Sequence, residues 1–559
     1  MNFLFVFMVI SCVIVTAKGA RILALIPFQA KSHYFVYEPL LKRLAEKGHD
    51  VVSVTHFPQK VPLSNFTDVD VSSSLPSLDG TMSLDGFTVK PGIEMLPEFF
   101  KHCGIMICDP LFQNPKLQKI INSKEKFDVF IVEMFATDCF LGIAHKMQIP
   151  IVVSVITCVA LPWSYGVIGN PETPSYIPNL FSSFTDRMDI FQRVENSWNF
   201  LYTKVLHKYF SDQPSYQIAK KYLGEDLPDF DSLRSNISLI LTNGHPTVST
   251  PRVQAPAFKE LGGMHIPASG PKPLPKNLKD YLDGQGKDGV VYFSLGSLLN
   301  STTMPARVLA AFYKAFEQLP QQILWKCSKE KMPTLPKNVK CIEWAPQLSI
   351  LCHPNVRLFI THGGLLGTQE AVYCGVPILG MPLFGDHHLN MAYFVKKGLA
   401  LQLNYGELSY EAISSALNEL LTNKSYAEVA RKTSLQFKDR LIHPTEEAVY
   451  WIEYLLRHGP NSLKTEVVNL AWYQYLLLDV ICIAIIDDCS YVWQVPARER
   501  CQWVRTTRDC ITDSVFQYTE FLFCNFDSEN IGLFAVGLIL MVLWLLYMFL
   551  ILGTTADNL

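Results

Sequence analysis

The sequence predicts an α/β protein made of two doubly wound, Rossmann-like halves, and three observations carry this prediction. Apolar runs alternate with helix-periodic stretches from residue 20 onward. A second series of the same kind begins at residue 289, and a segment rich in Pro and Gly separates the two. Such alternation favours parallel sheets covered by helices on both faces. We therefore place a first domain at 20–244, a linker at 245–288 and a second domain at 289–456.

The first half opens with a strand–helix–strand unit. An apolar strand at 21–27 and a second strand at 50–57 flank a stretch whose apolar residues recur at helical spacing. The run at 127–132 is another buried strand, and a helix and a further apolar run follow it. Residues 160–235 are richer in aromatic residues and Pro, with helical patches between them.

The second half begins with an apolar strand that ends in the turn Leu295-Gly296-Ser297. Tight Gly turns after a strand leave backbone N–H groups free for an anion, and the Ser297 hydroxyl adds a donor. The series then continues through further short apolar runs, which we expect to be strands at 322–326, 339–344, 358–361 and 376–381.

The stretch 359–390 is the most informative part of the chain. It is predicted to form a strand, a Gly-rich turn, a helix and a second strand. His362, Gly363 and Gly364 fall where the helix N-terminus offers free N–H groups and a positive dipole end to a phosphate. Ligands of such sheets bind beyond the carboxyl ends of the strands. The turn at 362–364 therefore predicts a phosphate site.

Polar side chains that can bind hydroxyl groups follow this turn. Glu370 lies two helical turns further on, and Asp386, His387 and Asn390 follow the second strand. Carboxylate, imidazole and amide groups bind the hydroxyls of ribose or of a hexose. A diphosphate cradle beside sugar-binding groups indicates a nucleotide sugar.

Composition and net charge argue against nucleic-acid binding. The chain has 559 residues, of which 49% are hydrophobic and 18% charged, as expected of a globular protein with some membrane segment. Its formal net charge of −3 gives no field that would collect nucleic acid.

Both ends of the chain indicate a secretory, membrane-anchored protein. The apolar run 3–15, followed by small residues, predicts a signal peptide at 1–19. The uncharged run 531–553 has the length of one transmembrane helix, which leaves a tail at 554–559. This order implies a type I protein with its bulk in the lumen.

A membrane-proximal region at 457–530 connects the second domain to that helix. Its apolar run at 471–486 is interrupted by Asp487 and Asp488, and a charge at the bilayer centre costs about 3 kcal/mol, so a span there is disfavoured.

Cysteines and glycosylation sequons complete the lumenal features. Cys139 and Cys374 lie in apolar helix patterns, so we expect buried thiols there rather than disulfides. Bridges are expected among the four cysteines of a polar segment, Cys489, Cys501, Cys510 and Cys524. Asn300 follows the Gly296 turn and is the least suitable sequon, so glycans are expected at Asn65, Asn236 and Asn423.

The stretch 359–390, together with Glu343-Trp344-Ala345-Pro346-Gln347 before it, resembles the signature of the UDP-glycosyltransferases. The resemblance covers about residues 20 to 480 and is greatest to arthropod members. It implies the GT-B arrangement, in which two Rossmann-like domains face each other across a cleft. It also implies an inverting transfer of a hexose from a UDP-sugar, UDP-glucose first, to hydroxyl groups of small lipophilic acceptors, as in detoxification. The expected location is the endoplasmic reticulum or another secretory-pathway membrane, and a homo-oligomer stays open.

The resemblance assigns roles to the donor-side residues. A planar indole after a strand can stack a uracil ring, worth ~1–3 kcal/mol by analogy with base stacking. The implied roles are uridine binding for Trp344 and Gln347, ribose binding for Glu370, diphosphate binding for Ser297, His362 and Gly364, and binding of the transferred sugar for Asp386 and His387.

His387 departs from the family pattern. Most relatives have Gln after the Asp, and Gln offers donors and an acceptor in a geometry that imidazole does not reproduce. Some plant relatives that prefer UDP-galactose carry His at this place. UDP-galactose is therefore the second donor to consider.

No metal or other cofactor is expected. Asp68-Val-Asp70 and Asp229-Phe-Asp231 match the Asp-x-Asp pattern of manganese-dependent transferases, but neither lies beside a Gly-rich turn. The helix dipole and backbone N–H groups would stabilise the leaving UDP instead.

His33 is the candidate general base. It lies after the loop that follows the first strand, it matches the base of the family by position, and its reference pKa of ~6.5 suits this role at neutral pH. A carboxylate should orient the second ring nitrogen. Glu133 and Asp138 both follow the strand at 127–132, and we slightly favour Asp138 because it keeps the family's Asp.

Two alternatives to this function stay open. One is a catalytically silent relative that binds a UDP-sugar or a lipophile. The other is a hexosyltransferase directed at lipids.

Overall fold

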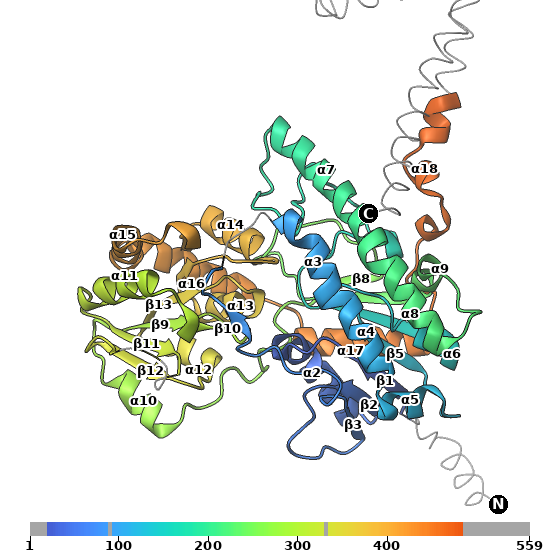
Figure 1. The fold of residues 1–559 in the computed structure, drawn as a ribbon, viewed down its shortest axis with the longest axis horizontal. Coiled ribbons are helices and arrows are strands. Elements are labelled where there is room, and N and C mark those ends of the chain that lie inside the picture. The colour runs from blue at the N-terminus through green and yellow to red at the C-terminus, as the bar shows by residue number, and fades with distance from the viewer. Residues whose placement is uncertain (1–18, 88–91, 329–331, 333, 484–559) are drawn as a thin grey trace, which may run out of the picture. The chain divides into compact units, whose positions relative to one another are not determined.

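The computed structural model describes residues 19–87, 92–328, 332 and 334–483, and Figure 1 shows their arrangement. The chain up to Val468 forms one compact unit that contains both sheets. From Asn469 onward a second unit begins, of which the described part contains the short helix α18 (Trp472–Tyr475).

The first half is built on a seven-stranded sheet in which every neighbouring pair is parallel. Strands β5, β6 and β7 are buried along their whole length, as expected of a parallel sheet covered on both faces. The strand order reverses between β1 and β5, which makes this the switch point where ligands bind. In spatial order the strands are β3 (Phe66–Asp70), β2 (Asp50–Thr55), β1 (Arg21–Leu25), β5 (Val129–Glu133), β6 (Ile151–Ile156), β7 (Ile237–Thr242) and β8 (Phe258–Glu260).

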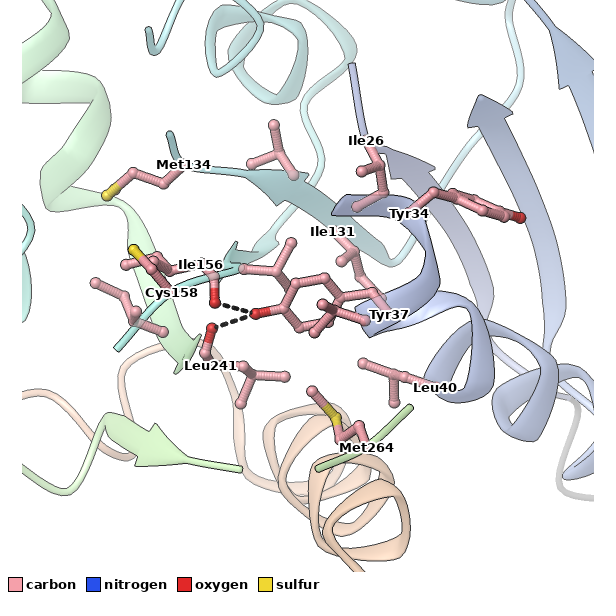
Figure 2. Packing of buried hydrophobic residues seen from close by; sticks show 14 of the residues in the cluster. Ile26, Tyr34, Tyr37, Leu40, Ile131, Met134, Ile156, Cys158, Leu241 and Met264 are labelled. Carbon is pink, nitrogen blue, oxygen red and sulfur yellow. Dashed lines mark hydrogen bonds between the residues drawn. The ribbon is translucent and has the colours of Figure 1, made fainter. Parts of the chain in front are cut away.

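Helix α2 (Lys31–Glu46) follows β1 directly and carries the candidate base near its start. Tyr37, one turn after His33, is fully buried, and its hydroxyl donates to the backbone carbonyls of Ile156 and Leu241. Figure 2 shows this ring between β6, β7 and the apolar residues around them. The contact fixes α2 against the carboxyl ends of two strands. The other helices of this half are α3 (Leu96–Phe100), α4 (Met106–Phe112), α5 (Pro115–Ile121), α6 (Gly142–Met147), α7 (Ile190–His207), α8 (Gln213–Leu223) and α9 (Phe230–Ser235).

The Pro- and Gly-rich segment 245–288 does more than connect the halves. It contributes β8, whose residues Phe258, Lys259 and Glu260 pair with the end of β7 and so complete the first sheet. It also contains helix α10 (Lys276–Asp283), which buries Leu278 and Leu282.

The second half has a six-stranded parallel sheet. Its strand order reverses between β9 and β13, so it has a switch point of its own. In spatial order the strands are β12 (Val339–Ile342), β11 (Gln322–Lys326), β9 (Val290–Ser294), β13 (Val356–Thr361), β14 (Ile378–Gly380) and β15 (Ala400–Gln402). The helices are α11 (Ala306–Glu317), α12 (Gln347–Leu351), α13 (Leu365–Cys374), α14 (His387–Lys397), α15 (Tyr410–Thr422), α16 (Lys424–Lys438) and α17 (Pro444–His458).

Two structures join the halves. Strand β4 (Met82–Ser83), from the first half, pairs with β10 (Leu299–Asn300) from the second. Helix α17 leaves the second half and packs on α2 and β6 of the first, as Figure 1 shows. The last helix of the compact unit therefore completes the core of the first half.

The expectation of buried free thiols is wrong at two positions. Cys139 forms a disulfide with Cys108, and Cys374 forms one with Cys352. A helical apolar pattern shows that a cysteine is buried but not that a second one, 31 or 22 residues away, lies against it. A third disulfide joins Cys327 and Cys341.

The predicted signal peptide, transmembrane helix and tail fall on residues outside those described. The same holds for Asp487, Asp488 and the four cysteines expected to pair after them. Among the described residues, no helix combines the length and the apolar character needed to cross a membrane.

Candidate active site

His33 and Glu133 form a hydrogen-bonded pair at the switch point of the first sheet. Glu133 is the last residue of β5, His33 lies in the first turn of α2, and β1 and β5 are adjacent. The Glu133 Oε1 lies 2.5 Å from His33 Nδ1, and the carboxylate is 1% exposed. A buried carboxylate there accepts the Nδ1–H proton, so the Nε2 lone pair is free to take a proton from a substrate.

The preference for Asp138 as the partner of His33 is wrong. The Asp138 Oδ2 lies 2.7 Å from Arg234 Nε, and the Nη2 of the same guanidinium lies 2.5 Å from Asp212 Oδ1. Burial alone would lower the pKa of Arg234, but the charges of Asp138 and Asp212 outweigh it and raise that pKa. His207 joins this buried cluster, and burial lowers its pKa to about 3. Asp138 therefore balances a buried arginine, away from the base.

A row of aromatic rings, named here the aromatic wall, begins beside the His33 ring. The rings of Phe28 and Phe135 have their centroids 4.4 and 4.6 Å from that of His33. Phe99 extends this row at 5.1 Å from Phe135, and Phe181 follows at 5.8 Å from Phe99. An acceptor that places a hydroxyl at His33 would therefore meet apolar surface.

The Gly-rich turns of the second half enclose the His362 ring from two sides. A Cβ at Gly296 would lie 2.7 Å from His362 Cε1, and a Cβ at Gly364 would lie 2.6 Å from His362 Nε2. A larger residue at either position would have to displace the His362 ring. Burial, followed by the charge of Lys326, lowers the pKa of His362 to about 4, so its imidazole is neutral at neutral pH. Ser297 follows Gly296 at the carboxyl end of β9, on the same sheet edge as the N-terminus of α13.

Gly363 and Asn390 hold this turn in place. Gly363 has φ +87°, and a Cβ there would lie 2.8 Å from Met391 Cγ. The Asn390 side-chain amide donates to the Gly363 carbonyl and to the Asp386 carboxylate, each at 3.0 Å. Asn390 thus ties the start of α14 to the turn that precedes α13.

Sequence reasoning missed Lys326, the last residue of β11. Its ammonium group donates to the Gly296 carbonyl at 2.9 Å, and burial lowers its pKa. The signal was present in the sequence, because a cation at the end of a strand next to β9 falls on the same sheet edge as the Gly296 turn.

The predicted uridine and ribose residues contact each other. The Gln347 amide accepts from the Tyr292 hydroxyl at 3.3 Å and donates to Glu370 Oε2 at 2.6 Å. Burial raises the pKa of Glu370 to about 7, against the opposing hydrogen bond from Gln347. Trp344 is 67% exposed, and the Lys31 Nζ of the first half lies over its ring, 4.6 Å from the centroid.

Asp386 caps the N-terminus of α14, whose first residue is His387, and it lies close enough to His33 for the two charges to interact. Burial raises the pKa of Asp386, while the Asn390 hydrogen bond and the charge of His33 oppose it. His387 is buried, with its ring centroid 4.5 Å from those of His362 and Phe384. Burial lowers the pKa of His387 well below its usual range, so its imidazole is neutral.

The remaining predicted positions lie away from this site. Asn65, Asn236 and Asn423 are exposed, whereas Asn300 is partly buried and caps a short 3-10 turn with its side chain. The Asp68 carboxylate accepts from the backbone N–H of Gln59, and Asp229 caps α9.

Comparison with known proteins assigns the chain to a family. The family model described as "UDP-glucoronosyl and UDP-glucosyl transferase" matches residues 22–494. UDP-glucosyltransferase 2 of Dactylopius coccus is 38% identical over 490 residues, which cover 87% of this chain and 93% of that protein. UDP-glucuronosyltransferase 2A2 of Homo sapiens is 32% identical over 487 residues, covering 83% of this chain and 89% of that one.

A solved structure shares the fold at low identity. The spinosyn forosaminyltransferase SpnP superposes with a TM-score of 0.51 at 16% identity, covering 78% of this chain and all of that one. At this identity the likeness shows a shared fold, here built on two parallel sheets. The chain therefore belongs to the UDP-glucoronosyl and UDP-glucosyl transferase family and is a UDP-glycosyltransferase with the GT-B fold.

Proposed function

We propose that this protein transfers glucose from UDP-glucose to a hydroxyl group of a small lipophilic acceptor, with inversion at the anomeric carbon. The observation that carries the proposal is the His33–Glu133 pair, whose imidazole lies within electrostatic range of Asp386 from the second half. The aromatic wall of Phe28, Phe135 and Phe99 supports a lipophilic acceptor.

The reaction is a single displacement. The acceptor oxygen bonds to the anomeric carbon as the bond from that carbon to the UDP oxygen breaks, and the acceptor proton passes to His33 Nε2. Glu133 holds the Nδ1–H and stabilises the imidazolium that forms. Free N–H groups at the start of α13 and the ammonium of Lys326 would stabilise the negative charge of the leaving UDP. In this scheme Trp344 stacks the uracil ring, Gln347 reads its edge, and Glu370 binds the ribose hydroxyls.

A donor screen tests the proposal directly. Purified full-length protein is offered UDP-glucose, UDP-galactose or UDP-glucuronate with a panel of phenols and aliphatic alcohols, and both UDP release and product mass are measured. We expect glucosides, and we expect His33→Ala to abolish them because the general base is lost. If the wild-type protein releases no more UDP than His33→Ala with every donor and acceptor, the proposal is wrong, and a catalytically silent relative becomes the better description.

UDP-galactose is the second candidate donor because of His387. Its neutral imidazole lies packed between His362 and Phe384, so a Gln there would present different donors to the sugar. We expect His387→Gln to change the ratio of kcat/KM for UDP-glucose and UDP-galactose, and His388→Gln, its neighbour, to leave that ratio unchanged. An unchanged ratio in His387→Gln removes this position from donor choice.

We also propose a lumenal location on a secretory-pathway membrane, supported by the apolar runs at 3–15 and 531–553. The exposure of Asn65, Asn236 and Asn423 is compatible with glycans on the same side. Endoglycosidase treatment of expressed protein should lower its apparent mass in steps that Asn→Gln substitutions at these sites remove one at a time. Protein of unshifted mass would contradict lumenal exposure.

A further inference from the structure

Helix α7 has its polar side inward. Asn196, Thr203 and His207 belong to its buried face, together with Phe200 and Leu206. The Asn196 amide accepts from the Asn179 N–H at 2.7 Å and donates to the carbonyls of Pro174 and Ile177. Asn196 and Thr203 thus have hydrogen-bond partners inside the fold, so this side of α7 packs against the first half.

The opposite side of α7 is apolar and faces outward. At about 100° per residue, its large apolar side chains fall within an arc of about 120°. Phe191 is 82% exposed and Val194 62%, and Leu201 and Val205 are also exposed. The members of this arc, named here the α7 arc, are Ile190, Phe191, Val194, Trp198, Leu201, Tyr202 and Val205.

Apolar surface of this extent is unusual on a soluble protein and indicates an apolar partner. The arc mixes aliphatic residues with Phe, Trp and Tyr, the composition of helices that lie at the boundary between lipid headgroups and acyl chains. Arg193 and Lys204 lie on one margin of the arc, where Lys204 pairs with Glu172, and Glu195 lies on the other, so these charges balance. A zwitterionic bilayer would therefore suffice.

The sequence after the described residues indicates which apolar partner would lie near α7. Its uncharged run 531–553 is long enough to span a bilayer, so a membrane is the surface that the tethered protein would always meet. Figure 1 shows α7 beside α3. Phe99 of α3 belongs to the aromatic wall that ends at His33, so the inner side of α7 lies near the proposed acceptor route.

We propose that the α7 arc lies in the lipid–water interface of the membrane that anchors the protein. This rests on the proposed membrane location but not on the chemistry of transfer. Seating α7 in lipid brings the aromatic wall close to the phase in which lipophilic acceptors dissolve.

Photolabelling of the intact protein tests the proposal. Full-length chain is reconstituted in phosphatidylcholine vesicles containing a hydrophobic aryl diazirine, and labelled peptides are quantified by mass spectrometry after irradiation. The α16 peptide that carries Leu435, 71% exposed, is the internal reference for apolar surface in water. We expect several-fold more label on the α7 peptide than on this reference.

Matched variants sharpen the result. Val194→Glu combined with Val205→Glu should reduce α7 labelling to the level of the reference, whereas Leu435→Glu should leave α7 labelling unchanged. Because the altered side chains are exposed, the thermal unfolding midpoint and the activity with a water-soluble acceptor should match wild type. An α7 peptide that stays heavily labelled in the double variant contradicts a lipid contact through this arc.

The 531–553 peptide separates failure of this proposal from failure of the membrane location. If that peptide is labelled and α7 is not, the α7 arc does not contact lipid. If neither is labelled, the anchoring on which the proposal rests is wrong as well. Labelling of α7 that rises when the protein is diluted in excess lipid would mean that a second copy covers the arc, and this overturns the proposal.

Discussion

Glu133 and Asp138 are two buried carboxylates with different electrostatic tasks. Glu133 holds the His33 imidazole, whereas Asp138 balances the Arg234 guanidinium. Glu133 is the last residue of β5, and Asp138 lies five positions further along the chain. Their partners show that position at the strand end, rather than the identity of the acid, decides which carboxylate reaches the base.

We expect Glu133→Gln and Asp138→Asn to fail in different ways. Glu133→Gln should lower kcat by about 10²–10⁴-fold with little change in the KM for the UDP-sugar, because the wrong imidazole tautomer would face the acceptor. Asp138→Asn should cost about 3 kcal/mol of unfolding free energy, because Arg234 loses a charge partner in the interior. Steady-state UDP release and thermal unfolding measure the two effects. A larger kcat loss in Asp138→Asn at an unchanged unfolding midpoint would reverse this assignment.

The Glu370 carboxyl should make stability depend on pH. Burial raises its pKa to about 7, above the unfolded value of about 4.3, so the folded state holds this proton more tightly. Its contribution to stability is therefore complete below about pH 4 and is lost as pH rises through 7, by at most about 4 kcal/mol.

Replacing Glu370 by Gln should remove that dependence. Urea unfolding should show the variant gaining up to about 4 kcal/mol relative to wild type between acidic pH and about pH 8. Exposed Glu407 is the control, because Glu407→Gln should give a difference from wild type that stays flat over the same range. A flat difference for Glu370→Gln would mean that its carboxyl titrates normally in the folded protein.

At the scale of elements, the glycines around His362 set the shape of the donor turn. Gly296 and Gly398 both have φ +80°, but the space around them differs. A Cβ at Gly296 would contact the His362 ring, whereas nothing lies within 4 Å of one at Gly398, which ends α14. Substitutions at these two glycines therefore distinguish the effect of backbone strain from the effect of displacing the His362 ring.

We therefore expect Gly296→Ala and Gly398→Ala to share one effect and differ in another. Each should lose about 1–2 kcal/mol of unfolding free energy, since an L-residue is strained at positive φ. Only Gly296→Ala should also weaken UDP binding, by about tenfold or more, equivalent to 1.4 kcal/mol or more. Calorimetric titration with UDP and thermal unfolding provide the measurements. Equal UDP affinity in the two variants would show that the His362 ring does not shape this turn.

Most elements could be predicted from the sequence, and the exceptions have physical reasons. Strands β5, β9 and β13 can be predicted from their apolar runs, because central parallel strands are buried on both faces. Strand β8 is three residues long and lies among Pro and Gly, so its sequence shows no periodicity. The Cys108–Cys139 bridge depends on α4 meeting the turn that precedes α6, which local patterns do not encode.

The same distinction applies to the candidate site. The Gly turns, Trp344 and His33 could be found because each occupies a fixed place relative to a strand end. The choice between Glu133 and Asp138 needed the position of Arg234, which approaches from α9, about a hundred residues later in the chain.

At the scale of the whole molecule, α17 links the stability of the two halves. It follows the second half in sequence, yet it buries Ile452 and Leu455 in the core cluster that includes α2. At its surface, Arg43 Nε lies 2.5 Å from Glu446 Oε1, with both side chains more than a third exposed. The amphipathic pattern of α17 predicts a helix, but it does not reveal which sheet the helix covers.

We expect apolar burial, rather than the ion pair, to hold α17 in place. Ile452→Ala should cost about 2–5 kcal/mol of unfolding free energy, because it removes methyl groups from a fully buried position. Arg43→Ala should cost less than about 1 kcal/mol, and high salt should reduce this further, because water screens an exposed pair. Urea unfolding followed by circular dichroism at low and high salt measures both. If Arg43→Ala costs as much as Ile452→Ala, the ion pair rather than the apolar face fastens the two halves together.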